Sequence, residues 1–206
     1  MPAYNRLYPD IEFAITEDSS LALEELLDKG QIDLLIGFAP IKGNDIEQVP
    51  LRSEKLYILI PSAILESAFD GDKDAWDRSR AGFIDIKDFA ECPFLMISTN
   101  NRVRMLADIY LKKNGVRPNI ILQAESIETL FALCLKGMGI TFYPEMFVEK
   151  INPSFFGEAH TALNAFPISD RETTGQLVIA YSKNRYLSNA VKEFISFTQN
   201  HYKIQI

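Results

Sequence analysis

The stretch Ser-Ile-Glu-Thr-Leu-Phe-Ala-Leu-Cys-Leu-Lys-Gly-Met-Gly-Ile-Thr-Phe-Tyr-Pro, residues 126–144, predicts a capped helix that leads into a buried strand. Apolar side chains recur at the spacing of one buried helical face, at Ile127, Leu130, Phe131, Cys134 and Met138. Ser126 stands where an N-cap is expected, and Glu128 places negative charge in the first turn. Gly137 and Gly139 end the helix before a short apolar strand. This unit is a scaffold, so its function depends on what its N-terminus faces.

The same alternation of helices and strands extends along the chain in both directions. The pattern predicts strands at 11–16, 32–38, 47–52, 54–60, 94–98, 119–124, 140–143 and 176–181. It predicts helices from Ser20 to Gly30, from near Asn100 to Gly115, over 126–138, and from Ser188 onward. Residues 62–90 are polar and are expected to be irregular. The order strand, helix, strand over 11–38 implies a parallel pair with a right-handed crossover.

These elements predict an α/β fold with two Rossmann-like lobes joined by a hinge. The middle of the chain interrupts a unit that its two ends form together. We expect residues 1–58 and 168–206 to form lobe I, and residues 59–167 to form lobe II.

Composition and charge exclude several classes of protein. The 206 residues carry a formal net charge of −7 with a sequence pI near 4.9, which argues against a nucleic-acid surface on this chain. Cys92 and Cys134 lie far apart, so neither a disulfide framework nor a zinc site is expected, and two thiols suit a reducing cytoplasm. No apolar run approaches the length of a membrane span and no signal peptide is recognisable, so we expect a cytoplasmic protein.

Catalytic and metal-binding patterns are weak. His160 lies beside no obvious nucleophile, His201 is near the C-terminus, and no nucleophile-elbow, zinc-protease, Walker or dinucleotide motif occurs. Carboxylates alternate through 70–74 as in a calcium loop, but Ala75 replaces the turn glycine and Ala81 replaces the bidentate glutamate. We therefore expect no enzyme, no catalytic residue, no metal site and no cofactor.

Polar residues gather where two of the predicted helices begin. Ser98, Thr99 and Asn100 follow one strand, and Ser126 follows the next. Free N–H groups and the positive end of the helix dipole, with these side chains, would suit a carboxylate or a phosphate at the carboxyl edge of a parallel sheet. The alternative is that these residues only cap helices.

Five segments, in this order, resemble the effector-binding domain of LysR-type transcriptional regulators. They are 8–13, 23–37, 49–61, 126–144 and 181–195, and together they span nearly the whole chain. The chain is similar to that domain without its winged helix-turn-helix, without its linker helix and without its first strand. The segment 62–82 is longer than the corresponding loop of the family.

The resemblance implies a type 2 periplasmic-binding-protein-like fold with a small, anionic effector in the cleft between the lobes. By position it implies ligand contacts from Ser98, Thr99, Asn100, Ser126, Phe38, Ala39, Phe142 and Tyr143. It also implies self-association, as a dimer of this domain and a tetramer of the intact regulator, with DNA bound only through the absent domain and no membrane contact. Two alternatives remain, a stand-alone solute-binding protein of a transport system and an enzyme on a similar two-lobed scaffold.

Overall fold

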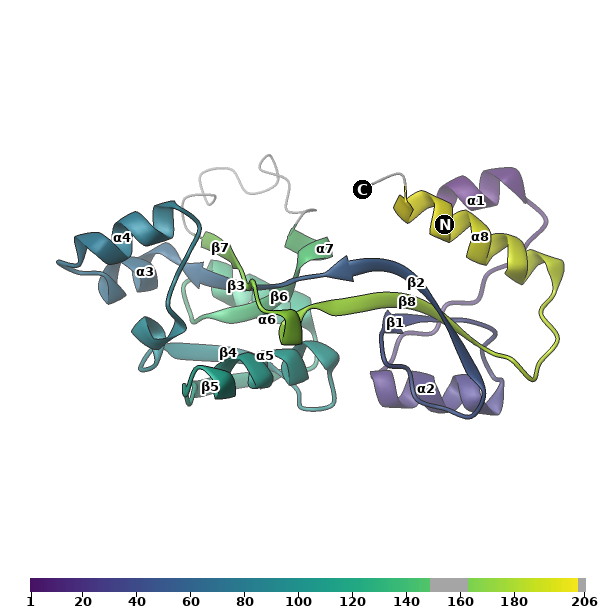
Figure 1. Ribbon diagram of the computed structural model, residues 1–206, viewed down its shortest axis with the longest axis horizontal. Helices are drawn as coiled ribbons and strands as arrows, with labels where there is room; N and C mark the ends of the chain where they lie inside the picture. The colour runs from purple at the N-terminus through teal and green to yellow at the C-terminus, as the bar shows by residue number, and fades with distance from the viewer. Residues whose placement is uncertain (149–162, 204–206) are drawn as a thin grey trace. The chain divides into compact units, whose positions relative to one another are not determined.

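The computed structural model describes residues 1–148 and 163–203, and its chain folds into two compact units (Figure 1). Unit 1 comprises Met1–Ser53 and Gly175–Ile206, and unit 2 comprises Glu54–Thr174. The expected lobe boundaries, after residue 58 and after residue 167, both fall inside unit 2. The reason is strand β3 (Leu56–Pro61), which pairs within unit 2 along its whole length, from Leu56 opposite Pro144 to Pro61 opposite Leu163.

Unit 1 is built on a three-stranded sheet in the order β1–β8–β2. Its strands are β1 (Leu35–Phe38), β2 (Ile46–Glu54) and β8 (Gly175–Ser182), and β1 runs antiparallel to β8. Its helices are α1 (Pro2–Leu7), α2 (Ser20–Lys29) and α8 (Asn189–Lys203). Helix α2 begins at Ser20 and ends before Gly30, as expected, because the Ser19 side chain caps it and Gly30 adopts a φ of +66°.

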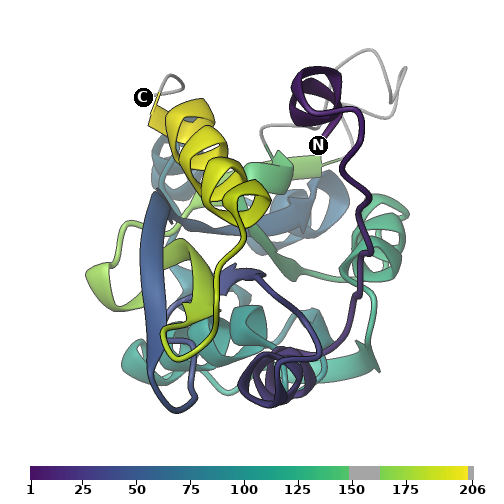
Figure 2. The same ribbon diagram turned by 90° about the vertical axis from the view of Figure 1, so that its right-hand side faces the viewer.

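Side chains of alternate residues of β8 pack on opposite faces of this sheet. Val178 and Ala180 pack in a cluster with Leu27 of α2, whereas Leu177 and Ile179 pack in a cluster with Ile195 of α8. Figures 1 and 2 show α2 on one side of the sheet and α8 on the other. The strand is therefore buried on both faces between two helices.

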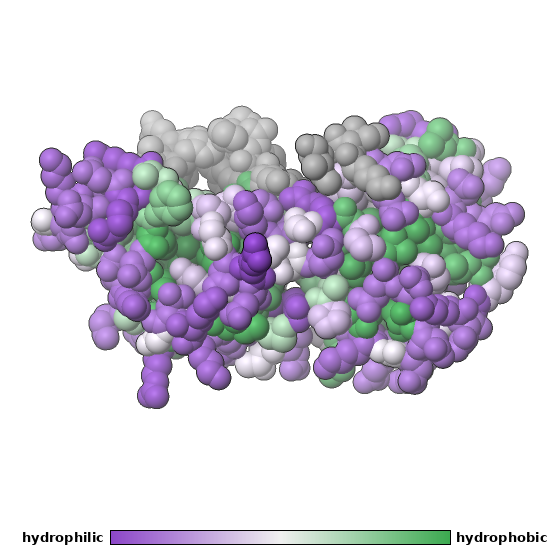
Figure 3. Space-filling view, in the orientation of Figure 1, coloured by the Kyte–Doolittle hydropathy of each residue, from purple (hydrophilic) through white to green (hydrophobic). Residues whose placement is uncertain are grey.

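The strand expected at 11–16 does not form, although the segment is well described. It runs as an extended connection between α1 and α2, and Ile15 is 71% exposed. A strand needs a neighbouring backbone to complete its hydrogen bonds, and no described strand pairs with this segment. The parallel crossover expected from 11–16 to 32–38 is therefore absent too. Figure 3 shows hydrophobic side chains reaching the surface of unit 1 between α8 and α2, and Ile36 of β1 is 49% exposed.

Unit 2 contains an antiparallel sheet and a parallel pair. The antiparallel sheet has the order β6–β3–β7, with β6 at Thr141–Pro144 and β7 at Leu163–Pro167. The parallel pair is β4 (Pro93–Ile97) with β5 (Asn119–Ala124), and Phe94 also forms a parallel bridge with Ile140. Helices α5 (Arg102–Lys113) and α6 (Ile127–Leu135) follow the parallel strands, and α7 (Glu145–Val148) follows β6. A short 3₁₀ turn, η4 (Arg171–Thr173), leads into β8.

The segment expected to be irregular contains regular structure. It forms α3 (Ser62–Ala68), α4 (Lys73–Arg80) and a 3₁₀ turn, η1 (Ile86–Phe89). Asp72 caps α4 by accepting a hydrogen bond from the Ala75 N–H at 2.9 Å, so this carboxylate has a structural role. Trp76 packs edge-on against Phe69 with ring centroids 5.7 Å apart, which fastens α4 to the core of unit 2. The helices are polar because most of their surface is exposed (purple side chains over α4 in Figure 3).

The opening stretch, 126–144, folds largely as its pattern predicts. Leu130 and Cys134 are buried on α6, and Gly137 adopts a left-handed φ of +83° just after the helix. The expectation for Met138 is wrong, because the helix ends at Leu135 and leaves that side chain 40% exposed. Gly139 has a different role from Gly137, since a Cβ there would lie 2.7 Å from the carbonyl oxygen of Pro93.

No helix among the described residues has both the length and the apolar character that crossing a bilayer requires.

Replacing Gly139 by alanine should lower the free energy of unfolding by about 1–3 kcal/mol, because the new methyl group meets the backbone of Pro93 rather than a movable side chain. Urea denaturation followed by circular dichroism measures the change. The neighbouring substitution Met138→Ala is the control, and its half-exposed side chain should shift stability by no more than about 0.5 kcal/mol. Equal stabilities of Gly139→Ala and the wild type would contradict the close approach.

The two thiols should differ in reactivity. Burial raises the pKa of Cys134 to about 12, and that of half-buried Cys92 is raised by burial and by the charge of Glu91. At pH 8 only roughly one Cys134 in ten thousand is then a thiolate, and the thiolate is the reactive form. We expect an aromatic disulfide reagent to label Cys92 slowly and Cys134 only after unfolding in guanidinium. Two thiols reacting rapidly in the folded chain would show that the core around Cys134 is open to solvent.

Candidate functional site

The parallel pairing of β4 with β5 brings the starts of α5 and α6 to the same edge of unit 2. Ile97 at the end of β4 lies opposite Ala124 at the end of β5. The Ser98 N–H then donates to the Ala124 carbonyl at 3.0 Å, which ties the two strand ends together where the helices begin. Parallel strands followed by helices place both helix N-termini at the edge where open α/β sheets bind ligands.

At this edge some polar residues cap a helix and others do not. Asn101 caps α5 through its side-chain oxygen, which accepts from the Val103 N–H at 2.8 Å, and Ser126 caps α6 by accepting from Thr129 at 3.1 Å. Thr99 and Asn100 lie in the exposed turn before Asn101, and neither side chain hydrogen-bonds to another described residue. The interpretation that these residues only cap helices therefore accounts for the side-chain oxygen of Ser126, but not for Thr99 or Asn100.

Two carboxylates face the two serines. The Ser98 hydroxyl donates to Glu125 Oε2 at 2.9 Å, and the Ser126 hydroxyl donates to Glu128 Oε2 at 3.0 Å. Both serines are half-buried, whereas both glutamates are exposed. Each hydroxyl has a single proton to donate, so a ligand that accepts from either serine must compete with a carboxylate. Glu125 did not emerge from sequence reasoning, and its only signal was its position directly before the cap.

The remaining expected contacts lie elsewhere. Phe142 is 3% exposed and stacks on Phe94 in the core of unit 2, with ring centroids 6.3 Å apart, which leaves it little surface for a ligand. Tyr143 is 5% exposed and stacks on Phe131 at 5.3 Å. Phe38 and Ala39, both half-buried, lie at the end of β1 in unit 1, where the Ala39 N–H donates to the Gln176 carbonyl at 2.8 Å.

This edge presents hydrogen-bond donors from two helix starts. Within 1–148 and 163–203, no group of three His, Cys, Asp or Glu side chains could hold a metal ion. His160 lies outside the described residues. What the edge offers is backbone N–H groups at two helix starts, three hydroxyls, from Ser98, Thr99 and Ser126, and one amide, from Asn100.

Comparisons with known proteins identify relatives over the whole chain. The family model described as the LysR substrate binding domain matches residues 1–203. A curated relative, the uncharacterized HTH-type transcriptional regulator YcgK of Bacillus subtilis (strain 168), is 24% identical over 207 residues, which cover 95% of this chain and 60% of the relative. The chain thus spans about three fifths of the length of this relative.

Solved structures share the fold at low sequence identity. The effector-binding domain of QuiR in complex with shikimate superposes with a TM-score of 0.74 at 20% identity, covering 100% of this chain and 89% of that one. The BenM effector-binding domain with its effector benzoate superposes with a TM-score of 0.73 at 17% identity, covering 99% of this chain and 84% of that one. These likenesses establish a type 2 periplasmic-binding-protein-like fold, as the sequence resemblance predicted.

Proposed function

Because this chain belongs to the LysR substrate binding domain family, we propose that it is the effector-binding regulatory domain of a transcriptional regulator. The observation that carries the proposal is the shared edge of β4 and β5, where two helix starts present Ser98, Thr99, Asn100 and Ser126 together. In this proposal the edge binds a small molecule and performs no chemistry on it. Phe38, Ala39, Phe142 and Tyr143 stay predicted contacts.

The effector that this edge suits is small and anionic. Backbone N–H groups at two helix starts provide partial positive charge and unsatisfied donors, which favour a carboxylate or a phosphate. The proteins of similar fold bind shikimate and benzoate, each of which has one carboxylate. By analogy, we expect an effector of this chain to place one anionic group over Ser98 and Ser126.

Glu125 and Glu128 set a limit on the charge of that effector. Two unit charges about 4 Å apart interact by roughly 1 kcal/mol in water, and by more where water is partly excluded. Each additional negative charge on the effector would therefore be repelled by carboxylates that already accept hydrogen bonds from Ser98 and Ser126. The arrangement favours a monoanion over a dianion or a trianion.

We propose that another domain of the whole protein produces the response to the effector. Relatives that are longer than this chain are described as helix-turn-helix transcriptional regulators, which favours transcription control over the alternative of a stand-alone solute-binding protein. We propose that effector binding here alters a DNA-binding domain in the whole protein through self-association, as a dimer of this domain within a tetramer.

Calorimetric titration of the chain with a panel of small carboxylates and phosphates tests the proposal. We expect at least one saturable monoanionic ligand, with affinity lowered about tenfold to a hundredfold by Ser98→Ala, since a hydrogen bond to a charged group contributes roughly 1.5–3 kcal/mol. Asp72→Ala is the matched control, because it removes a helix cap in the same unit, at α4, and should leave binding unchanged. Absence of any saturable ligand across the panel would count against the effector site.

The role of Glu125 has its own test. Replacing Glu125 by glutamine keeps an oxygen that can accept from Ser98 but removes the negative charge. Affinity for the anionic ligand found in the panel should rise about twofold to fivefold, and the gain should shrink in high salt. An unchanged or weaker affinity at low salt would show that the anionic group does not bind near Glu125.

A further inference from the structure

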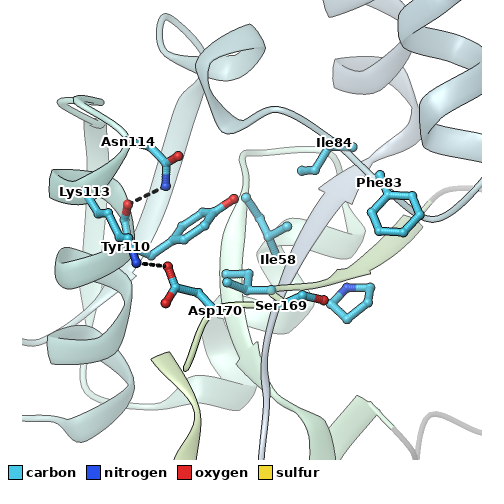
Figure 4. Close-up of a pocket in the computed structure, with 10 residues that line it drawn as sticks. Ile58, Phe83, Ile84, Tyr110, Lys113, Asn114, Ser169 and Asp170 are labelled. Atoms are coloured by element: carbon cyan, nitrogen blue, oxygen red, sulfur yellow. Dashed lines mark hydrogen bonds and ion pairs between the residues drawn. The ribbon is translucent and has the colours of Figure 1, made fainter. Parts of the chain in front are cut away.

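A second concave site lies in unit 2, away from the starts of α5 and α6. It is a pocket of about 230 Å³ at the C-terminal end of α5 (Figure 4). It is formed where α5 meets β3, the segment after α4, and the turn between β7 and η4. Its lining residues are Ile58, Phe83, Ile84, Tyr110, Lys113, Asn114, Pro167, Ile168, Ser169 and Asp170. The effector residues Ser98 to Asn100 precede the other end of the same helix.

One wall of the pocket is apolar and could contact a ring or an alkyl group of a ligand. Ile58 and Ile168 are buried at its floor, whereas Phe83 is 65% exposed at its mouth. Covering the Phe83 ring with a ligand would remove apolar surface from water, which is favourable. The volume exceeds the roughly 150 Å³ cavity that holds benzene and is below the size of a drug-binding pocket. The pocket therefore suits one ring with a short side chain.

The Tyr110 hydroxyl is the polar group within this apolar surface. Figure 4 shows the Tyr110 side chain directed into the pocket toward Ile58 and Ile84. The ring contacts Phe142 edge-on at 6.4 Å, and the hydroxyl has no hydrogen-bond partner among the described residues. Burial, followed by the charges of Asp85 and Asp170, raises the pKa of Tyr110, so the phenol stays neutral at physiological pH. Its oxygen can accept a hydrogen bond from a ligand.

The charge around the pocket is negative. Lys113 Nζ lies 2.8 Å from Asp170 Oδ2 and 3.3 Å from Glu172 Oε2, so its single positive charge already faces two carboxylates. Asp85 adds a third negative charge close enough to act on Tyr110. A ligand with an anionic group would find the lysine of the lining already paired. A ligand with a cationic group would find an excess of negative charge and aromatic rings at Tyr110 and Phe83.

We propose that this pocket binds a small organic ammonium ion, with its ring or alkyl body on Ile58, Ile168 and Phe83 and its ammonium group between Tyr110 Oη and Asp170. The site is separate from the proposed effector edge and selects the opposite charge. Its ligand and the effector can therefore be measured independently, and the failure of one site would not imply the failure of the other.

Methyl-detected NMR titration with 2-phenylethylammonium tests the proposal on the intact chain. We expect saturable shifts at the methyl groups of Ile58, Ile84 and Ile168, and none at Ile36 or Ile41 of unit 1, with a Kd near the millimolar range, about −4 kcal/mol. The neutral isostere 2-phenylethanol should bind more weakly, and 3-phenylpropanoate more weakly still. Equal or tighter binding of the carboxylate at these methyl groups would overturn the proposal, as would the absence of saturable shifts there.

Two variants with matched controls locate the polar contacts. Tyr110→Phe removes only the hydroxyl and should weaken ammonium binding about threefold to tenfold, whereas Tyr186→Phe, at an exposed tyrosine of unit 1, should change nothing. Asp170→Asn should weaken binding of the ammonium but not of the alcohol. Its control is Glu47→Gln, which removes an ion pair of similar length, 2.9 Å to Lys183, in unit 1. Unchanged ammonium affinity in both pocket variants would refute the assigned contacts.

Discussion

The parallel hydrogen bonding of β4 fixes where helices α5 and α6 begin in unit 2. On one side β4 pairs with β5, and on the other Leu95 and Pro93 exchange backbone hydrogen bonds with Ile140, each 2.8 Å long. The strand thus has parallel neighbours on both sides, and the helices that follow β4 and β5 must begin at the same edge. The approach of Gly139 to Pro93, too close for any side chain, allows the second pairing. A ligand site at the helix starts is a consequence of this arrangement rather than an addition to it.

The elements that the sequence predicted well are those whose signals are local. A cap, a periodic apolar face and a terminal glycine occur within one helix, so α2, α6 and α8 could be recognised from their own residues. Strands β3, β4 and β5 are continuous or alternating apolar runs and are equally self-contained. The same locality explains why the sequence alone predicts Ser98 and Ser126 at one edge, since each follows a strand and precedes a helix.

The failures came where structure depends on distant partners. Residues 11–16 alternate apolar and polar side chains as a strand does, but this pattern does not supply a neighbouring backbone to pair with. Helices α3 and α4 bury few side chains, so their sequences resemble a polar loop, although Phe69 and Trp76 hold the region against the core. Glu125 could not be foreseen as a partner of Ser98, because 27 residues separate them and only the strand register brings them together. The pocket at Tyr110 is assembled from four separate segments and has no motif at all.

Helix α5 connects the two proposed sites, because one lies at its N-terminus and the other at its C-terminal end. Its N-terminus follows the effector residues, and its last residue, Lys113, is paired with Asp170 and Glu172 in the turn that precedes β8. This twelve-residue helix is about 18 Å long, and rigid secondary elements are among the structures that carry energetic coupling between sites. An ammonium ion that binds Asp170 would compete with Lys113 for that carboxylate and so loosen the end of α5. If binding at either end displaces α5, each ligand changes the affinity of the chain for the other by the same factor.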